Sequence, residues 1–195
     1  MEDDRDEVHV ASAEQWRAWL LDHHASSPGI WLVTWKKGSG PYVAYDDVVD
    51  QALCFGWVDS RPGSLDADRS RRLLTPRRPG SSWSRVNKER VERLTAAGRM
   101  APAGLAAVAA AQADGSWTAL DAVETLAEPD DLAAALDAEP AARGQWDGFP
   151  RSTRRAILEW ISTAKTAPTR ERRIAQTVAE AAVGRRANQW RQPGT

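Results

Sequence analysis

The sequence contains a single cysteine, Cys54, and only three histidines among 195 residues. One thiol cannot form a disulfide within the chain, and the scattered histidines lack the spacing of a zinc site. We therefore expect no metal or other cofactor, and a reducing compartment, the cytoplasm. Cys54 ends an apolar helical pattern, which favours a buried structural thiol over a nucleophile.

Long hydrophobic runs are also missing. No stretch approaches the roughly 18 apolar residues of a membrane-spanning helix, and the acidic start, MEDDRDEV, lacks the apolar core of a secretory signal. We expect a protein that is neither exported by that route nor inserted in a membrane.

The common signatures of catalysis are absent as well. The chain has no glycine-rich phosphate or dinucleotide loop, no GxSxG serine, no HExxH motif and no paired CxxC. These absences weaken the case for an enzyme without excluding one.

The net charge of −1 conceals four blocks of alternating sign. Residues 1–60 contain 4 basic residues (Lys and Arg) and 11 acidic residues (Asp and Glu), and residues 61–100 contain 11 basic and 4 acidic. Residues 101–149 contain 1 basic and 9 acidic, and residues 150–195 contain 10 basic and 3 acidic. Either the blocks of opposite sign face one another and largely cancel, or the two basic blocks form one surface that attracts anions.

The apolar patterns predict an α+β fold, a small antiparallel β-sheet packed with helices, followed by a C-terminal helical bundle. With 42% hydrophobic residues the chain can build a core. Helical spacing, caps and stop signals predict helices over 12–24, 45–55, 82–97, 102–113, 129–138, 140–147, 152–164 and 168–182. β-branched and aromatic residues predict strands over 30–36, 57–61 and 71–75, with a turn at Pro62-Gly63 and a linker over 114–128.

These elements suggest two domains with tails. We expect a disordered acidic tail over 1–8, an α+β domain over 9–122, a C-terminal helical domain over 123–184 and a flexible tail over 185–195.

Several motifs resemble the YdeI/OmpD-associated, or bacteriocin-protection, family in their order and spacing, over about residues 12–184. They are KKGSG at 36–40, ALCFGWVDS at 52–60, TPRR at 75–78, WSRVNKER at 83–90, GRM at 98–100, and WISTAK at 160–165 with TR at 169–170 and RI at 173–174. The resemblance implies an intracellular bacterial protein linked to stress and antimicrobial tolerance, without a settled reaction. One departure is Ala44, where the family often has a Ser or Thr that caps the helix. The absence of this cap costs about 1 kcal/mol of local stability.

A cluster of arginines, serines and tryptophans around Pro76–Asn87 is the candidate site. Arginines on a rigid loop beside a serine-rich helix start combine charge, hydroxyls and free N–H groups, which suit phosphate or carboxylate. Two lysines reach it if strand 30–36 lies beside strand 57–61, and a tryptophan offers a flat face for a ring. The candidate ligand-binding residues are Lys36, Lys37, Trp57, Asp59, Ser60, Arg77, Arg78, Ser82, Trp83, Ser84 and Asn87.

Other interpretations of this cluster stay open. The serines could cap a helix while an arginine pairs with Asp59 and Trp83 anchors the loop to the core. Eleven basic residues in 61–100, interleaved with tryptophans, also suit single-stranded nucleic acid. A third interpretation is acid–base catalysis by Asp59 beside Ser60.

Basic residues in the C-terminal part form a second candidate surface. Lys165, Arg170 and Arg173 surround a turn between two helices, where cations bind free carbonyls and Thr caps the next helix. This architectural role is favoured over binding of a protein partner. The counterpart is either an acidic partner or the acidic block 101–149.

Overall fold

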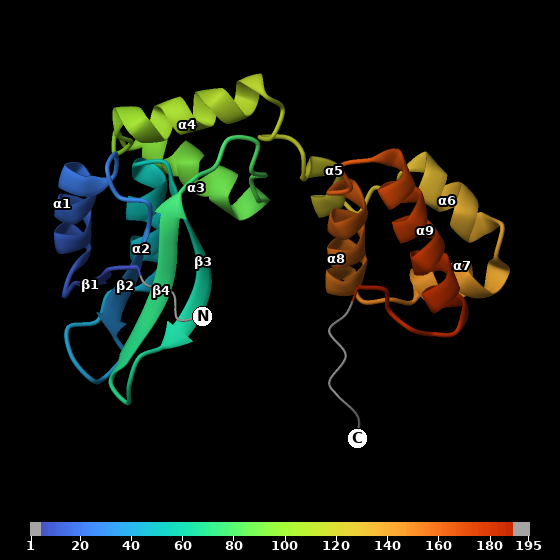
Figure 1. The fold of residues 1–195 in the computed structure, drawn as a ribbon, viewed down its shortest axis with the longest axis horizontal. Coiled ribbons are helices and arrows are strands. Elements are labelled where there is room, and N and C mark those ends of the chain that lie inside the picture. Colours follow the sequence, from blue (N-terminus) through green and yellow to red (C-terminus); the bar gives the residue numbers. More distant parts are fainter. Residues whose placement is uncertain (1–4, 189–195) are drawn as a thin grey trace. The chain divides into compact units, whose positions relative to one another are not determined.

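The computed structural model describes residues 5–188, which divide into two compact units at the boundary between Ala119 and Leu120. In the described part of the chain, the first unit combines a sheet with helices and the second consists of helices only (Figure 1). The α+β class with a helical C-terminal region is therefore confirmed. The sequence patterns placed the boundary at 122–123, whereas the units meet at 119–120.

The first unit contains a four-stranded sheet in the order β1-β2-β4-β3. The strands are β1 (Glu7–His9), β2 (Ile30–Trp35), β3 (Trp57–Ser64) and β4 (Arg69–Pro76). β4 pairs antiparallel with both β2 and β3, whereas β1 pairs parallel with β2. The three predicted strands therefore pair antiparallel, and the sheet is mixed because β1, which was not predicted, adds a parallel edge.

The first strand lies partly in the segment predicted to be a disordered tail. Val8 packs against the hydrophobic core, and Glu7 forms an ion pair with Arg71 at 3.0 Å. A three-residue edge strand is too short to show an alternating pattern, so the acidic composition dominated the prediction. Residues 1–4 lie outside the described residues.

β3 also extends further than predicted. The register breaks between Asp59 and Pro62, and the strand then continues through Pro62 and Gly63 to Ser64. Proline is tolerated because β3 lies at the sheet edge, where a missing N–H breaks no inner ladder. The true turn lies between Ser64 and Arg69.

The helices of the first unit follow the predictions within a few residues. They are α1 (Ala13–His23), α2 (Tyr45–Cys54), α3 (Arg85–Ala96) and α4 (Pro102–Ala113). Ser12 caps α1 by accepting the Gln15 N–H, whereas Ala44 gives α2 no side-chain cap. The core beneath them includes Trp16, Leu20, Leu32, Leu53, Trp57 and Leu74.

α4 packs closely on the end of α2. The Ala101 N–H donates to the Cys54 carbonyl at 3.0 Å, and a Cβ added at Gly104 would collide with that carbonyl. Only glycine permits this approach. Cys54 is fully buried as a result, which agrees with the structural role predicted for it.

The second unit has its own core. Its helices are α5 (Asp121–Glu124), α6 (Asp130–Asp137), α7 (Pro140–Asp147), α8 (Arg151–Ser162) and α9 (Ala167–Ala182). The core includes Leu132, Leu136, Trp146, Ile157 and Ile161. The short α5 lies within the stretch predicted to be a linker.

The end of the described chain also packs more than predicted. Ala187 is only 2% exposed and belongs to the second core, and Arg185 pairs with Glu180. The remainder of the predicted flexible tail, 189–195, lies outside the described residues. Among residues 5–188, no helix has the length and apolar character to cross a membrane.

Candidate functional site

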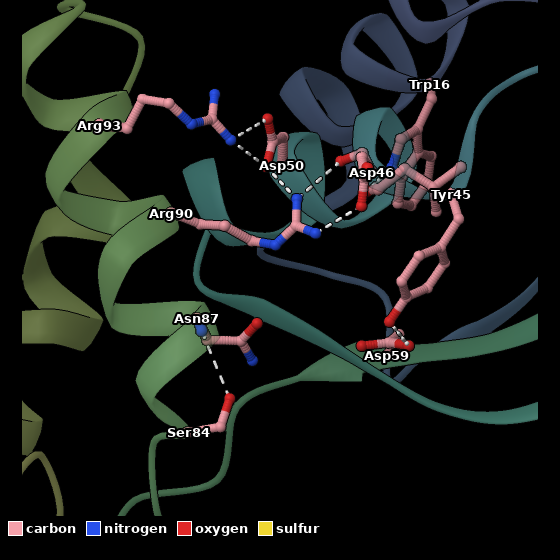
Figure 2. A network of polar contacts seen from close by, with 10 residues as sticks. Trp16, Tyr45, Asp46, Asp50, Asp59, Ser84, Asn87, Arg90 and Arg93 are labelled. Atoms are coloured by element: carbon pink, nitrogen blue, oxygen red, sulfur yellow. Dashed lines mark hydrogen bonds and ion pairs between the residues drawn. The ribbon is translucent and has the colours of Figure 1, made fainter.

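Ion pairs with α2 hold α3, the helix that follows the arginine loop, in place (Figure 2). Asp50 is 5% exposed and accepts hydrogen bonds from Arg90 at 2.9 Å and Arg93 at 2.7 Å, while Arg90 also binds Asp46. The carboxylates come from the acidic first block and the guanidinium groups from the basic second block. Opposite blocks therefore pair within this unit, as the first charge interpretation predicted.

The start of α3 uses a serine as a structural cap. The Ser84 hydroxyl accepts the Asn87 N–H at 3.3 Å, which Figure 2 shows at the lower end of α3. Ser82 contributes its backbone carbonyl, which accepts a hydrogen bond from Arg77 at 3.3 Å. These contacts support the structural interpretation for Ser84 and Ser82.

Trp57 lies in the core and offers no face to a ligand. Its side chain is 1% exposed, and its indole N–H donates to the His24 carbonyl at 3.1 Å. The ring packs edge-on against Trp16 and Trp19 of α1. The sequence pattern did not show that helices cover this face of the sheet.

The two lysines lie away from the arginine loop. The lysines were expected to reach the loop if β2 lay beside β3, but β2 pairs with β4 instead. Lys36 follows the end of β2 that pairs with Arg69, and its ammonium group donates to the carbonyls of Asp66 and Ala67 in the β3–β4 turn. Lys37 is exposed beside it. Arg77 follows the opposite end of β4.

Asp59 is held by two donors other than the predicted ones. Its Oδ2 accepts from the Tyr45 hydroxyl at 3.0 Å and from Arg72 at 3.1 Å, and the Arg72 guanidinium lies over the Tyr45 ring. Burial, followed by the charge of Asp59, raises the pKa of Tyr45. Asp59 thus pairs with Arg72, and not with Arg77 or Arg78.

Arg77 is a partly buried cation that makes no direct ion pair, although the charge of Asp59 acts on it from a distance. Its guanidinium carbon lies 3.6 Å from the centre of the Trp83 ring, and its Nε is buried without a hydrogen-bond partner. Within residues 5–188, no carboxylate lies within ion-pair distance of it. Burial lowers its pKa to about 10, so the group is still protonated at neutral pH.

Arg77 lines a hollow of about 120 Å³, which we call the loop hollow. Asp114 provides its one carboxylate, which accepts the N–H groups of Gly80 at 3.1 Å and Ser116 at 2.9 Å. Two guanidinium groups therefore face one carboxylate. The lining residues are Arg77, Arg78, Pro79, Gly80, Ser81, Trp83, Ala107, Ala110, Ala111, Asp114 and Ser116.

The structure therefore brings only some of the predicted ligand-binding residues together. Arg77, Arg78 and Trp83 line the loop hollow, with Ser82 and Ser84 in the same loop. Ser60 is exposed on β3, and its hydroxyl donates to the Leu73 carbonyl at 3.4 Å. Asp114 was missed because it lies about 30 residues further along the chain, at the end of α4.

The basic residues of the C-terminal candidate surface bind mainly within their own unit. Arg170 makes two hydrogen bonds to Asp131, at 2.6 and 2.8 Å, so the counterpart comes from the acidic block 101–149. Arg173 donates to the Trp160 carbonyl and to the Thr163 hydroxyl at the end of α8. Thr166 caps α9. These contacts support the architectural role, while Lys165 is exposed.

Among the described residues, no group of three His, Cys, Asp or Glu side chains could hold a metal ion.

Two family models match separate segments of the chain. Residues 8–107 match a domain of unknown function, DUF8412, and residues 125–184 match the model described as bacteriocin-protection, YdeI or OmpD-associated. Comparisons with curated proteins and with solved structures give no match. Most motifs of the resemblance lie in the first segment, and the WISTAK motif lies in the second. The chain therefore belongs to the DUF8412 family, whose model covers just over half of it, and its residues 125–184 match the model described as bacteriocin-protection, YdeI or OmpD-associated.

Proposed function

We propose that the protein binds a small anionic ligand of the phosphate or carboxylate type in the loop hollow. The setting that we propose is the bacterial cytoplasm, in tolerance of stress or antimicrobials; the description of the model that matches residues 125–184, bacteriocin-protection, supports the antimicrobial part. The observation that carries the proposal is Arg77, a charged group that lines the loop hollow, has a buried Nε without a hydrogen-bond partner and makes no direct ion pair with a described residue.

The energetics of Arg77 support an anionic ligand. A partly buried guanidinium with one unsatisfied N–H is costly, and a phosphate or carboxylate accepts charge-assisted hydrogen bonds from such a group. Trp83 fixes the plane of the guanidinium, which lowers the entropy lost on binding. Asp114 opposes an anion, but its own two backbone N–H partners offset part of its charge.

A thermal-shift and calorimetric titration tests the proposal. The probes are inorganic phosphate, acetate, citrate and adenosine monophosphate at constant ionic strength. An anion at 100 times its Kd stabilises the protein by about 2.7 kcal/mol, which shifts the melting temperature by several degrees. We expect Arg78→Met to weaken anion binding at least tenfold, because the substitution removes one of the two guanidinium groups that line the loop hollow. Arg78 is exposed, so its replacement should not disturb folding.

The matched control is Arg85→Met, which removes an exposed guanidinium paired with Glu89 on the adjacent helix. It should bind as the wild type does. If none of the anions shifts the wild-type melting temperature, or if Arg78→Met and Arg85→Met behave alike, the proposal is wrong.

Single-stranded nucleic acid is the second candidate. It is favoured by Arg61 and Arg71, which lie 5.4 and 4.6 Å from the Trp31 ring centre on the sheet. Against it, Trp57 and Trp83, expected to stack on bases, are only 1% and 2% exposed. Anisotropy of a labelled oligothymidylate would show a steep fall in affinity with salt if this candidate holds. Catalysis by Asp59 is less well supported, because Tyr45 and Arg72 already bind its carboxylate.

A further inference from the structure

The loop hollow contains charges of both signs that do not pair with each other. Arg77 and Arg78 come from the loop that follows β4, whereas Asp114 is the residue that follows α4. All three line the hollow, yet no ion pair joins either guanidinium group to the Asp114 carboxylate. An anion alone would bind the arginines and be repelled by Asp114. The arrangement as a whole therefore fits a ligand that carries both charges.

The arginine side of the hollow has donors that the described residues do not use. Nη1 of Arg77 donates to the Ser81 hydroxyl at 3.5 Å and to the Ser82 carbonyl at 3.3 Å, whereas Nη2 makes no hydrogen bond to a described residue. The Arg78 side chain is exposed and makes none to a described residue either. A carboxylate accepts paired, charge-assisted hydrogen bonds from guanidinium groups, so this side suits the anionic end of the ligand.

Asp114 can bind a cation in addition to its present partners. One carboxylate oxygen accepts the Gly80 N–H at 3.1 Å, and the other accepts the Ser116 N–H at 2.9 Å. A carboxylate offers about four acceptor positions, so about two remain. Interaction with the Ser116 side chain, followed by that of its N–H, lowers the pKa of Asp114, so the group is charged at neutral pH. The remaining positions suit an ammonium group, which only donates.

The rest of the hollow is apolar and small. α4 contributes a wall of Ala107, Ala110 and Ala111, and the Trp83 ring lies on the loop side. The volume is about 120 Å³. A protein cavity of roughly 150 Å³ takes up benzene, which has about six heavy atoms. The two charged groups of the ligand must therefore be carried on a short carbon skeleton.

We infer that the ligand is a small α-amino acid, whose carboxylate binds Arg77 and Arg78 and whose ammonium group binds Asp114. This inference rests on the proposed function, since it keeps a carboxylate at the arginines and adds the group of opposite charge. The short side chain faces the alanine wall. Asp114, which opposes a simple anion, thereby selects the amino acid over the same carboxylate without an amine.

Calorimetry of the full chain with L-alanine, propionate and ethylamine, at neutral pH and constant ionic strength, tests this inference. Propionate is alanine without its ammonium group, and ethylamine is alanine without its carboxylate. We expect alanine to bind at least tenfold more tightly than either, because one molecule supplies both charged groups. Leucine and phenylalanine should bind more weakly than alanine, since their side chains are too large for the hollow.

Asp114→Asn distinguishes a binding role of Asp114 from a structural one. It should weaken alanine binding at least tenfold, to the level of propionate, and leave propionate binding unchanged or tighter, because the opposing charge is gone. A structural role would weaken both ligands alike and would overturn the inference. Arg78→Met should weaken both ligands, because both carry the carboxylate. The comparison of alanine with propionate on the wild type needs no variant.

Asp22→Asn is the matched control, because it removes the same charge from an exposed aspartate of α1 that does not line the loop hollow. It should change the affinity of neither ligand. If propionate binds through Arg78 and alanine binds no more tightly, the inference is overturned while the proposed function stands. If no carboxylate or phosphate binds in any form, alanine included, both fail. Tighter binding of O-phosphoethanolamine than of alanine would also overturn the inference, because the zwitterion would then be an aminoalkyl phosphate.

Discussion

Asp59 shows how single residues differ from their sequence pattern. Both of its protein donors, Tyr45 and Arg72, bind the same oxygen, Oδ2. The sequence marked Asp59 as important because it lies in a motif, and the predicted strand placed it correctly in β3. Its partner could not be predicted, since the register of β3 and β4 pairs Asp59 with Leu74, and Arg72 lies two residues away along β4. The same limit applies to Lys36, whose place depends on strand order.

We predict that Asp59→Asn lowers the pKa of Tyr45 without restoring it fully. Burial is the main cause of the raised pKa and persists, whereas the charge of Asp59 is removed. Absorbance at 295 nm in a Tyr42→Phe background follows Tyr45 alone, because the chain has two tyrosines. Since the folded state holds this proton more tightly, the contribution of Tyr45 to stability is complete below about pH 10 and is lost as the pH rises further. An unchanged titration midpoint would contradict the assignment.

At the level of elements, capping residues and stop signals predicted the helices well. Ser12, Gly56, Ser84 and Pro102 each lie where the pattern placed a helix boundary. Positive φ at Gly56, +74°, explains why the chain turns there into β3. The strands β2, β3 and β4 were located, but β1, the strand order and the β3 irregularity were not, because pairing depends on contacts distant in the sequence. The candidate site was only partly predictable for the same reason: the loop is local, whereas the loop hollow is not.

We predict that Ala44→Ser stabilises the protein by about 1 kcal/mol and that Ser84→Ala destabilises it by a similar amount. Ala44 already has the extended backbone of a cap residue, with φ −65° and ψ 145°, so serine needs no rearrangement. Urea unfolding followed by tryptophan fluorescence measures both changes. A variant Ala44→Ser no more stable than the wild type would show that α2 gains nothing from a side-chain cap.

At the scale of the whole molecule, each unit balances its own charge and builds its own core. Residues 1–119 carry 15 basic against 16 acidic residues, and residues 120–195 carry 11 of each. In the second unit, Glu128 binds Arg143 at 2.8 Å and the Trp146 indole at 2.7 Å. The buried residues of the two cores do not overlap. This division agrees with the match of two family models to separate segments.

We predict that residues 1–119 and 120–195 fold independently. Expressed separately, each should show helical far-ultraviolet circular dichroism and a cooperative melt, because neither core needs residues of the other. The intact chain should then melt in two transitions whose midpoints match those of the separate units. If either segment is unfolded alone, its core depends on the other unit.

The close packing of Gly104 against the Cys54 carbonyl has a chemical consequence. Burial raises the pKa of this thiol and shields it from reagents, and the sequence contains no other. A thiol-reactive dye can therefore label the protein only while the packing around Cys54, which includes α4, opens. The labelling rate therefore measures how often this packing opens. It reports on the first unit alone, because the one cysteine lies there.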